Sequence, residues 1–159
     1  MCRAKSVSTY ANSILATREA RVDVYDEALL LDTDGFVAEG ASGNVFLGQA
    51  RRAVRTGNDL DGITRRSVLE LAAGMGLEVV ARRITRDELH CADEVFFTGT
   101  AAELTPVVEV DRHRIGDGRP GPLTCELQRR YFDCVLERNR GHAAWLDLIG
   151  LADDPRQTA

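Results

Sequence analysis

Apolar residues recur along the chain in two patterns, one typical of helices and the other of short strands. A spacing of three and four residues predicts helices at about 6–18, 64–74 and 123–138. In the first of these, Tyr10, Ile14 and Leu15 lie on one face, which we expect to pack into the core. A capping box, Thr85 to Glu88, predicts a further short helix that ends near His90.

Short apolar runs between turn residues predict strands. The predicted strands are Ala28–Leu31, Phe36–Ala38, Asn44–Leu47, Leu77–Ala81, Val95–Phe97 and Leu104–Val110. Asp34-Gly35 predicts a hairpin turn between the first two strands, and Gly48 to Arg51 resembles another turn. The 159 residues suit one α/β domain, at about 1–150, followed by a polar tail at 151–159.

Composition narrows the classes of protein. Hydrophobic residues make up 44% and charged residues 28%, which excludes a wholly disordered chain. The net charge of −5 and the lack of long basic runs argue against a nucleic-acid partner. Apolar runs are far shorter than the roughly 18 residues of a membrane span, and the start lacks the apolar core of a signal peptide. We therefore expect a cytoplasmic protein without a membrane partner.

The four cysteines and three histidines do not point to a metal. No cysteine pair has C-x-x-C spacing, and no cysteine lies at metal-ligand spacing from a histidine. We expect no metal site and reduced, partly buried thiols.

The basic residues are unevenly divided, because 19 of the 20 are arginine and one is Lys5. Arginine replaces lysine on a solvated surface but not in amine chemistry, since its guanidinium stays protonated. A coding preference for arginine explains most of this bias. The remaining lysine is nevertheless a candidate for a Schiff-base nucleophile.

Two glycine-containing segments and one carboxylate are candidates for a binding site. Gly62-Ile63-Thr64 opens a predicted helix, and Gly99-Thr100-Ala101 follows a predicted strand, so both offer backbone N–H groups to an anion. Glu39 leads into a glycine-rich bend and could keep a heterocyclic nitrogen protonated. Ordinary turns and a solvated glutamate explain each feature alone. Together with Lys5 they are the parts that a pyridoxal phosphate site requires.

Several stretches resemble the C-terminal, cofactor-binding part of branched-chain amino acid aminotransferases, which belong to the class IV pyridoxal phosphate enzymes. They are Ala4-Lys5, Tyr10–Ala16, Tyr25–Asp32, Ala38–Gly40, Asn44–Phe46, Leu60–Arg65, Ala92–Glu103 and Gly118–Leu123. The resemblance covers about residues 4–149. It implies the class IV aminotransferase fold, an α/β domain with a mixed sheet or pseudo-barrel and flanking helices.

The resemblance assigns cofactor contacts to three side chains. Lys5 would be the Schiff-base lysine and would also shuttle the substrate proton. Tyr10 would hydrogen-bond the phenolic oxygen of pyridoxal 5'-phosphate. Glu39 would pair with the pyridinium nitrogen.

The resemblance also assigns the anion contacts. Gly62, Ile63 and Thr64 would bind the cofactor phosphate at a helix N-terminus, and Thr100 would add its hydroxyl. Backbone N–H groups of Thr100 and Ala101 would receive the substrate α-carboxylate.

The sequence departs from the family pattern at several points. The family's Lys-x-x-Gly-Asn-Tyr reads Lys-Ser-Val-Ser-Thr-Tyr here, and Gly43-Asn44 stands where many members have Glu-Asn. The family's N-terminal domain, which supplies a phosphate-binding arginine and much of the side-chain pocket, is absent from the sequence.

The resemblance implies transamination of branched-chain amino acids with 2-oxoglutarate. One alternative is a non-catalytic or partner-dependent remnant of such an enzyme. Another is a D-amino acid aminotransferase or aminodeoxychorismate lyase. The expected partners are an amino acid and a 2-oxo acid, together with a second copy of the chain or a separately encoded N-terminal half. We expect an exposed apolar surface where such a half would dock.

Overall fold

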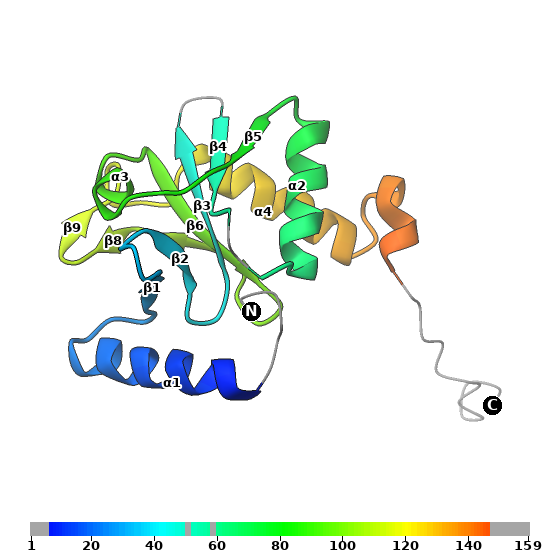
Figure 1. Cartoon of the computed structure of the whole chain (residues 1–159). Helices are drawn as coiled ribbons and strands as arrows, with labels where there is room; N and C mark the ends of the chain where they lie inside the picture. Colours follow the sequence, from blue (N-terminus) through cyan, green and yellow to red (C-terminus); the bar gives the residue numbers. More distant parts are fainter. Residues whose placement is uncertain (1–6, 50–51, 58–59, 147–159) are drawn as a thin grey trace.

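A five-stranded mixed sheet forms the centre of the fold in the computed structural model, which describes residues 7–49, 52–57 and 60–146. Its strand order is β5-β4-β3-β6-β7 (Figure 1). The strands are β3 (Asn44–Gln49), β4 (Arg52–Arg55), β5 (Glu78–Ala81), β6 (Glu94–Gly99) and β7 (Glu103–Val107). Neighbours run antiparallel except β4 and β5, which are parallel.

Both faces of this sheet are buried. Along β3, Val45 and Leu47 join one apolar cluster and Phe46 joins the other, as the two-residue period of a strand requires. β6 repeats the alternation, and its Phe96 stacks on Phe46 with ring centroids 5.1 Å apart. The sheet therefore divides the core into two layers.

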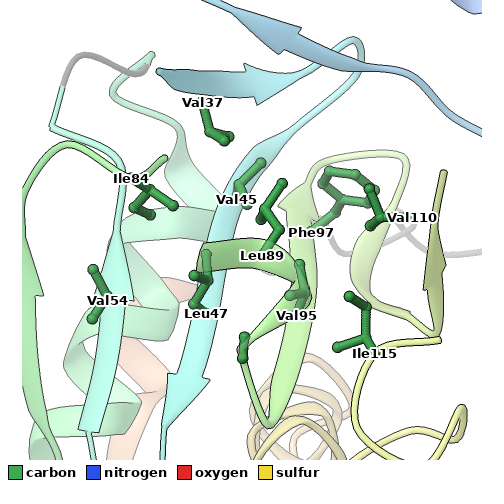
Figure 2. Close-up of a cluster of buried hydrophobic side chains, with 11 residues drawn as sticks. Val37, Val45, Leu47, Val54, Ile84, Leu89, Val95, Phe97, Val110 and Ile115 are labelled. Carbon is green, nitrogen blue, oxygen red and sulfur yellow. The ribbon is translucent and has the colours of Figure 1, made fainter. Parts of the chain in front are cut away.

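The first layer lies beneath three small elements (Figure 2). They are the hairpin of β1 (Leu29–Leu31) and β2 (Val37–Gly40), the short helix α3 (Arg86–His90), and the hairpin of β8 (Glu109–Val110) and β9 (His113–Arg114). The buried cluster comprises Val37, Val45, Leu47, Val54, Ile84, Leu89, Ala92, Val95, Phe97, Val110 and Ile115.

The second layer lies between the sheet and two longer helices (Figure 1). These are α2 (Ile63–Gly74) and α4 (Pro122–Val135), followed by the 3-10 helix η1 (Arg140–Trp145). The buried cluster comprises Phe46, Val68, Leu71, Ala72, Phe96, Leu104, Leu127 and Cys134.

A carboxylate of the sheet holds the start of α4. The buried Glu94 accepts the N–H groups of Leu123 and Thr124 at 2.9 and 2.8 Å, and the Thr124 hydroxyl at 2.7 Å. A Cβ on the N-cap residue Gly121 would lie 1.9 Å from the carboxyl carbon of Glu94. Only glycine leaves room for this long-range cap.

Helix α1 (Val7–Val22) stands apart from both layers, which corrects the expectation that its apolar face packs into the core. The side chains of Tyr10, Ile14 and Leu15 are 43%, 54% and 66% exposed. The β1–β2 hairpin already covers the nearer sheet face (Figure 1). A hollow of about 910 Å³ lies between the end of α1 and strands β1, β7 and β8. The apolar stripe therefore has no core to enter in this chain.

Most of the other elements agree with those predicted from the sequence. Gly35 has φ +85° in the predicted hairpin turn, and the Thr85 capping box is present. Strand β4 was not predicted, because only Ala53 and Val54 carry its apolar pattern between two arginines. The turn predicted at residues 48–51 is wrong for Gly48 and Gln49, which extend β3; the two residues that follow lie outside the described ranges.

The described part of the chain contains no helix long and apolar enough to cross a membrane. Within those same ranges, no group of three or more His, Cys, Asp or Glu side chains is placed to hold a metal ion. Cys91 and Cys125 are free and exposed, and Cys134 is free and buried. The proposed polar tail lies outside the described residues.

Candidate functional site

A cavity of about 380 Å³ opens where β6 ends and β3 begins, between α1 and the start of α2. It brings together segments that are far apart in the sequence. The predicted site residues that line it are Tyr10, Glu39, Gly62, Ile63, Thr64 and Thr100. Its size suits a small cofactor, since such sites measure about 300–1,000 Å³.

The N-terminus of α2 forms one wall of the cavity. Its N-cap residue Gly62 is extended, with φ −72° and ψ 144°, and makes no side-chain cap. The N–H groups of the first helical turn, at Ile63 and Thr64, therefore remain available to an anion. The Thr64 side chain is buried, whereas that of Ile63 is 78% exposed, so Ile63 contributes mainly backbone.

The end of β2, which carries the half-buried Glu39, and the tight bend after it form the second wall. The Gly40 N–H donates to the carbonyl of Gly43 at 2.7 Å, which closes the bend. A Cβ on Gly43 would lie 2.6 Å from the Thr98 carbonyl oxygen. A side chain at this position would therefore push the bend away from β6.

The turn between β6 and β7 forms the third wall. A Cβ on Gly99 would lie 2.9 Å from the Ser42 carbonyl oxygen, so this turn and the bend touch backbone to backbone. Thr100 and Ala101 are exposed on the turn; Thr100 lines the cavity, whereas Ala101 lies outside its described lining. Glu103 closes the turn in the left-handed region, with φ +51°.

The fourth wall is the first part of α1, which places Tyr10 and Ser13 against the cavity. Tyr10 is 43% exposed, so this side of the cavity is open to solvent. Lys5, the predicted nucleophile, lies outside the described residues, and its role stays a prediction.

Sequence reasoning gave no role to the residues that hold the α2 wall in place. The buried Asn44 side chain donates to the Leu60 carbonyl at 2.7 Å, and the buried Arg65 Nε donates to the same oxygen at 3.2 Å. Asp61 pairs with Arg65 at 2.8 Å and with Arg66 at 2.9 Å. Two features of the sequence could have indicated these residues. Asn44 is a polar residue directly before the apolar run of β3, and Arg65 lies on the face of α2 that packs inward.

Comparisons with known proteins agree on one family. The family profile "Amino-transferase class IV" matches residues 1–110. The chain is 50% identical over 152 residues to the branched-chain-amino-acid aminotransferase of Pseudomonas aeruginosa, covering 94% of this chain and 49% of that protein. It is 39% identical over 151 residues to the Escherichia coli K12 enzyme of the same name, covering 92% and 48%.

Solved structures give the same result. A branched-chain amino acid aminotransferase (T.th.), complexed with N-(5'-phosphopyridoxyl)-L-glutamate, matches with a TM-score of 0.91 at 43% identity, over 94% of this chain and 51% of that one. The Thermobaculum terrenum enzyme in its PLP form matches with a TM-score of 0.90 at 39% identity, over 94% and 50%. The expected class IV aminotransferase fold is confirmed. The chain spans about half the length of the relatives it matches.

Proposed function

We propose, since this chain belongs to the amino-transferase class IV family, that it takes part in pyridoxal-phosphate-dependent transamination of branched-chain amino acids. The amino acceptor in this proposal is 2-oxoglutarate. The observation that carries the proposal is one cavity lined by Tyr10, Glu39, the α2 N-terminus and Thr100. These residues come from four separate parts of the sequence.

The chemistry of the cavity suits a phosphorylated nitrogen heterocycle. The uncapped start of α2 offers N–H donors and the positive end of a helix, which favour a phosphate. Glu39 offers a carboxylate to a protonated ring nitrogen, and Tyr10 offers a phenol to a ring oxygen. Bound pyridoxal phosphate supplies an electron sink for the carbanion that forms when the substrate loses its α proton.

The chain's own residues have separate tasks in this reaction. Glu39 keeps the ring nitrogen protonated, and the N–H groups of Ile63 and Thr64 orient the phosphate. Lys5 would hold the cofactor through its amine and, once the substrate amine had displaced it, would move the proton to and from the substrate α carbon. The turn at Thr100 and Ala101 presents N–H groups to the substrate carboxylate.

Borohydride reduction tests the cofactor proposal directly. The purified chain is incubated with pyridoxal phosphate, reduced, digested and mapped by mass spectrometry. We expect the cofactor to be fixed on Lys5, the only lysine of the sequence, and to be absent from Lys5→Arg. A folded chain that carries no adduct would overturn the proposal.

A coupled assay tests the substrates. We expect transfer from leucine, isoleucine or valine to 2-oxoglutarate, and a lower rate from D-alanine. Misplaced substrate-positioning groups cost orders of magnitude in rate, so the chain is assayed alone and with a bacterial relative's N-terminal half. A rate no higher than that of free cofactor in both mixtures would contradict the proposal.

The exposed apolar side chains of α1 favour a second candidate, a domain that works only with a partner. Ile14 and Leu15 are exposed on the helix that forms the α1 wall of the cavity. A second copy or a separate N-terminal half that covered them would also close that wall. Activity that appears only in the mixture would support this candidate, and full activity of the monomeric chain would exclude it.

A further inference from the structure

We infer that Asn44 and Arg65 are positioning residues that aim the N-terminus of α2 at the phosphate of the cofactor. The inference rests on the proposed function. Neither side chain is assigned a contact with the phosphate, because both act through the backbone of residues 60–62.

The Leu60 carbonyl oxygen is the point on which both side chains act. It accepts the Asn44 Nδ2 at 2.7 Å, the Gly62 N–H at 2.8 Å and the Arg65 Nε at 3.2 Å. The three donors come from β3, from the N-cap of α2 and from its first turn. One carbonyl therefore ties the sheet, the loop and the helix together immediately before the anion-binding N–H groups.

Close packing adds to these hydrogen bonds. A Cβ on Gly62 would lie 2.6 Å from the Asn44 Oδ1, so the side-chain amide rests directly against the N-cap residue. Asn44 is only 4% exposed, and its backbone pairs with Thr98 of β6. The amide is thus fixed by the sheet, and the N-cap is fixed by the amide.

Arg65 contributes charge as well as a hydrogen bond. Its side chain is 10% exposed and pairs with Asp61 at 2.8 Å, which compensates the buried guanidinium. Asp61 itself lines the cavity and is bound on its other side by Arg66. The two arginines compensate the charge of this carboxylate, so the helix end stays positive for an incoming anion.

This arrangement prepares the site before the anion arrives. Donors that are already aimed lose less entropy on binding than donors that must first be ordered. Without the Asn44 amide, residues 60–62 gain freedom, and the N–H groups of Ile63 and Thr64 lose their alignment. Loss of the Asn44 amide should therefore weaken the binding of ligands that carry a phosphate.

The experiment compares Asn44→Leu, which keeps the branched shape of the side chain and removes the donor, with a matched control. The control is Gln128→Met, because the Gln128 amide makes the same kind of bond, to the Leu104 carbonyl at 2.9 Å, outside the cavity. Each protein is titrated with pyridoxal phosphate and with pyridoxal, which lacks the phosphate. Amide exchange at Gly62 and Arg66 is measured by NMR without ligand.

We expect Asn44→Leu to bind pyridoxal phosphate about fivefold to tenfold more weakly, the equivalent of one lost hydrogen bond, and pyridoxal within about twofold of wild type. Exchange at Gly62 and Arg66 should rise, and Gln128→Met should match wild type in every measurement. Arg65→Lys, which keeps the charge but not the Nε geometry, should move the same readouts in the same direction if Asn44→Leu does not fold.

The outcomes separate this inference from the proposed function. Equal pyridoxal phosphate affinity in wild type and variant, or an equal loss for pyridoxal, would overturn the inference and leave the proposed function standing. Wild type that does not bind pyridoxal phosphate would overturn the proposed function and, with it, the role in phosphate binding. Faster exchange would then show only that the side chains stabilise the loop.

Discussion

Helices α1 and α4 both carry apolar side chains four residues apart, but their surroundings are opposite. On α4, Leu127 is fully buried, and Leu123 and Tyr131 pack beside it against the second cluster. On α1, Tyr10 and Ile14 follow the same step of four residues and lie largely in solvent. Spacing thus predicts a helix and an apolar face, but it does not identify what covers that face.

The difference in burial comes from the elements that surround each helix. The first turn of α4 is tied to the sheet by Glu94, and its apolar face lies on the strands. The strands nearest α1 are already covered by the β1–β2 hairpin, and the large hollow lies beyond it. Helix α4 therefore packs into the core of this chain, whereas the apolar side chains of α1 remain exposed and could contact a partner surface.

Truncating a leucine on each helix should give the largest difference in stability between the two helices. Leu127→Ala leaves a cavity in the second cluster and should lower the free energy of unfolding by about 2–5 kcal/mol. Leu15→Ala, 66% exposed on α1, should change it by less than about 0.5 kcal/mol. Urea denaturation at constant m-value measures both. Similar losses for the two variants would mean that α1 packs in solution.

Removing the tie at the start of α4 should have the next largest effect. Glu94→Gln keeps the size of the side chain but loses the charge that receives the N–H groups of Leu123 and Thr124. We expect a loss of about 1–3 kcal/mol, because a buried bond to a charged group is replaced by a weaker one. Glu126→Gln, a change at a partly exposed position on the same helix, is the control. A loss no larger than that of the control would show that the cap is dispensable.

The sequence predicted the central strands of the sheet better than it predicted β4 and the burial of α1. Short, continuous apolar runs located β3 and β6, because both faces of these strands are buried. It missed β4, whose two apolar residues are too few to produce a pattern. The burial of α1 was predicted wrongly because amphipathicity does not depend on whether a partner surface is present.

The candidate site was predicted through chemistry rather than periodicity. Glu39, Gly62 and Thr100 are far apart in the sequence; their chemistry suggested a common site, the resemblance assigned their roles, and the cavity brings them together. Asn44 and Arg65 received no role, because a residue that acts through a neighbour's carbonyl leaves no signature of its own. The tight approach of Gly43 to Thr98 was equally invisible without the packing of the bend against β6.

Polar substitutions on α1 should change association rather than stability. The double variant Ile14→Ser, Leu15→Ser removes the exposed apolar side chains and leaves the two core layers intact. We expect self-association of the chain to weaken by at least about tenfold, with unfolding free energy altered by less than about 1 kcal/mol. Sedimentation velocity over a concentration series measures the first quantity. Wild type that stays monomeric at high concentration would contradict the prediction.

The exposed face of α4 should give the smallest effect, one confined to low pH. Hydrogen bonds from Arg129 and Arg130 lower the pKa of Glu126 from 4.5 to about 2. Since the folded state holds this carboxylate ionised more strongly than the unfolded state does, its contribution to stability is fully present above pH 4.5. It is lost as the pH falls from 4.5 toward about 2. The stability difference between wild type and Glu126→Gln should therefore shrink over that interval and stay constant above it, as urea midpoints would record. The difference should be small throughout, because the three side chains are solvated. A gap that widens on acidification would mean that the arginines do not hold Glu126 in solution, and that α4 is ordered by its buried face and its cap alone.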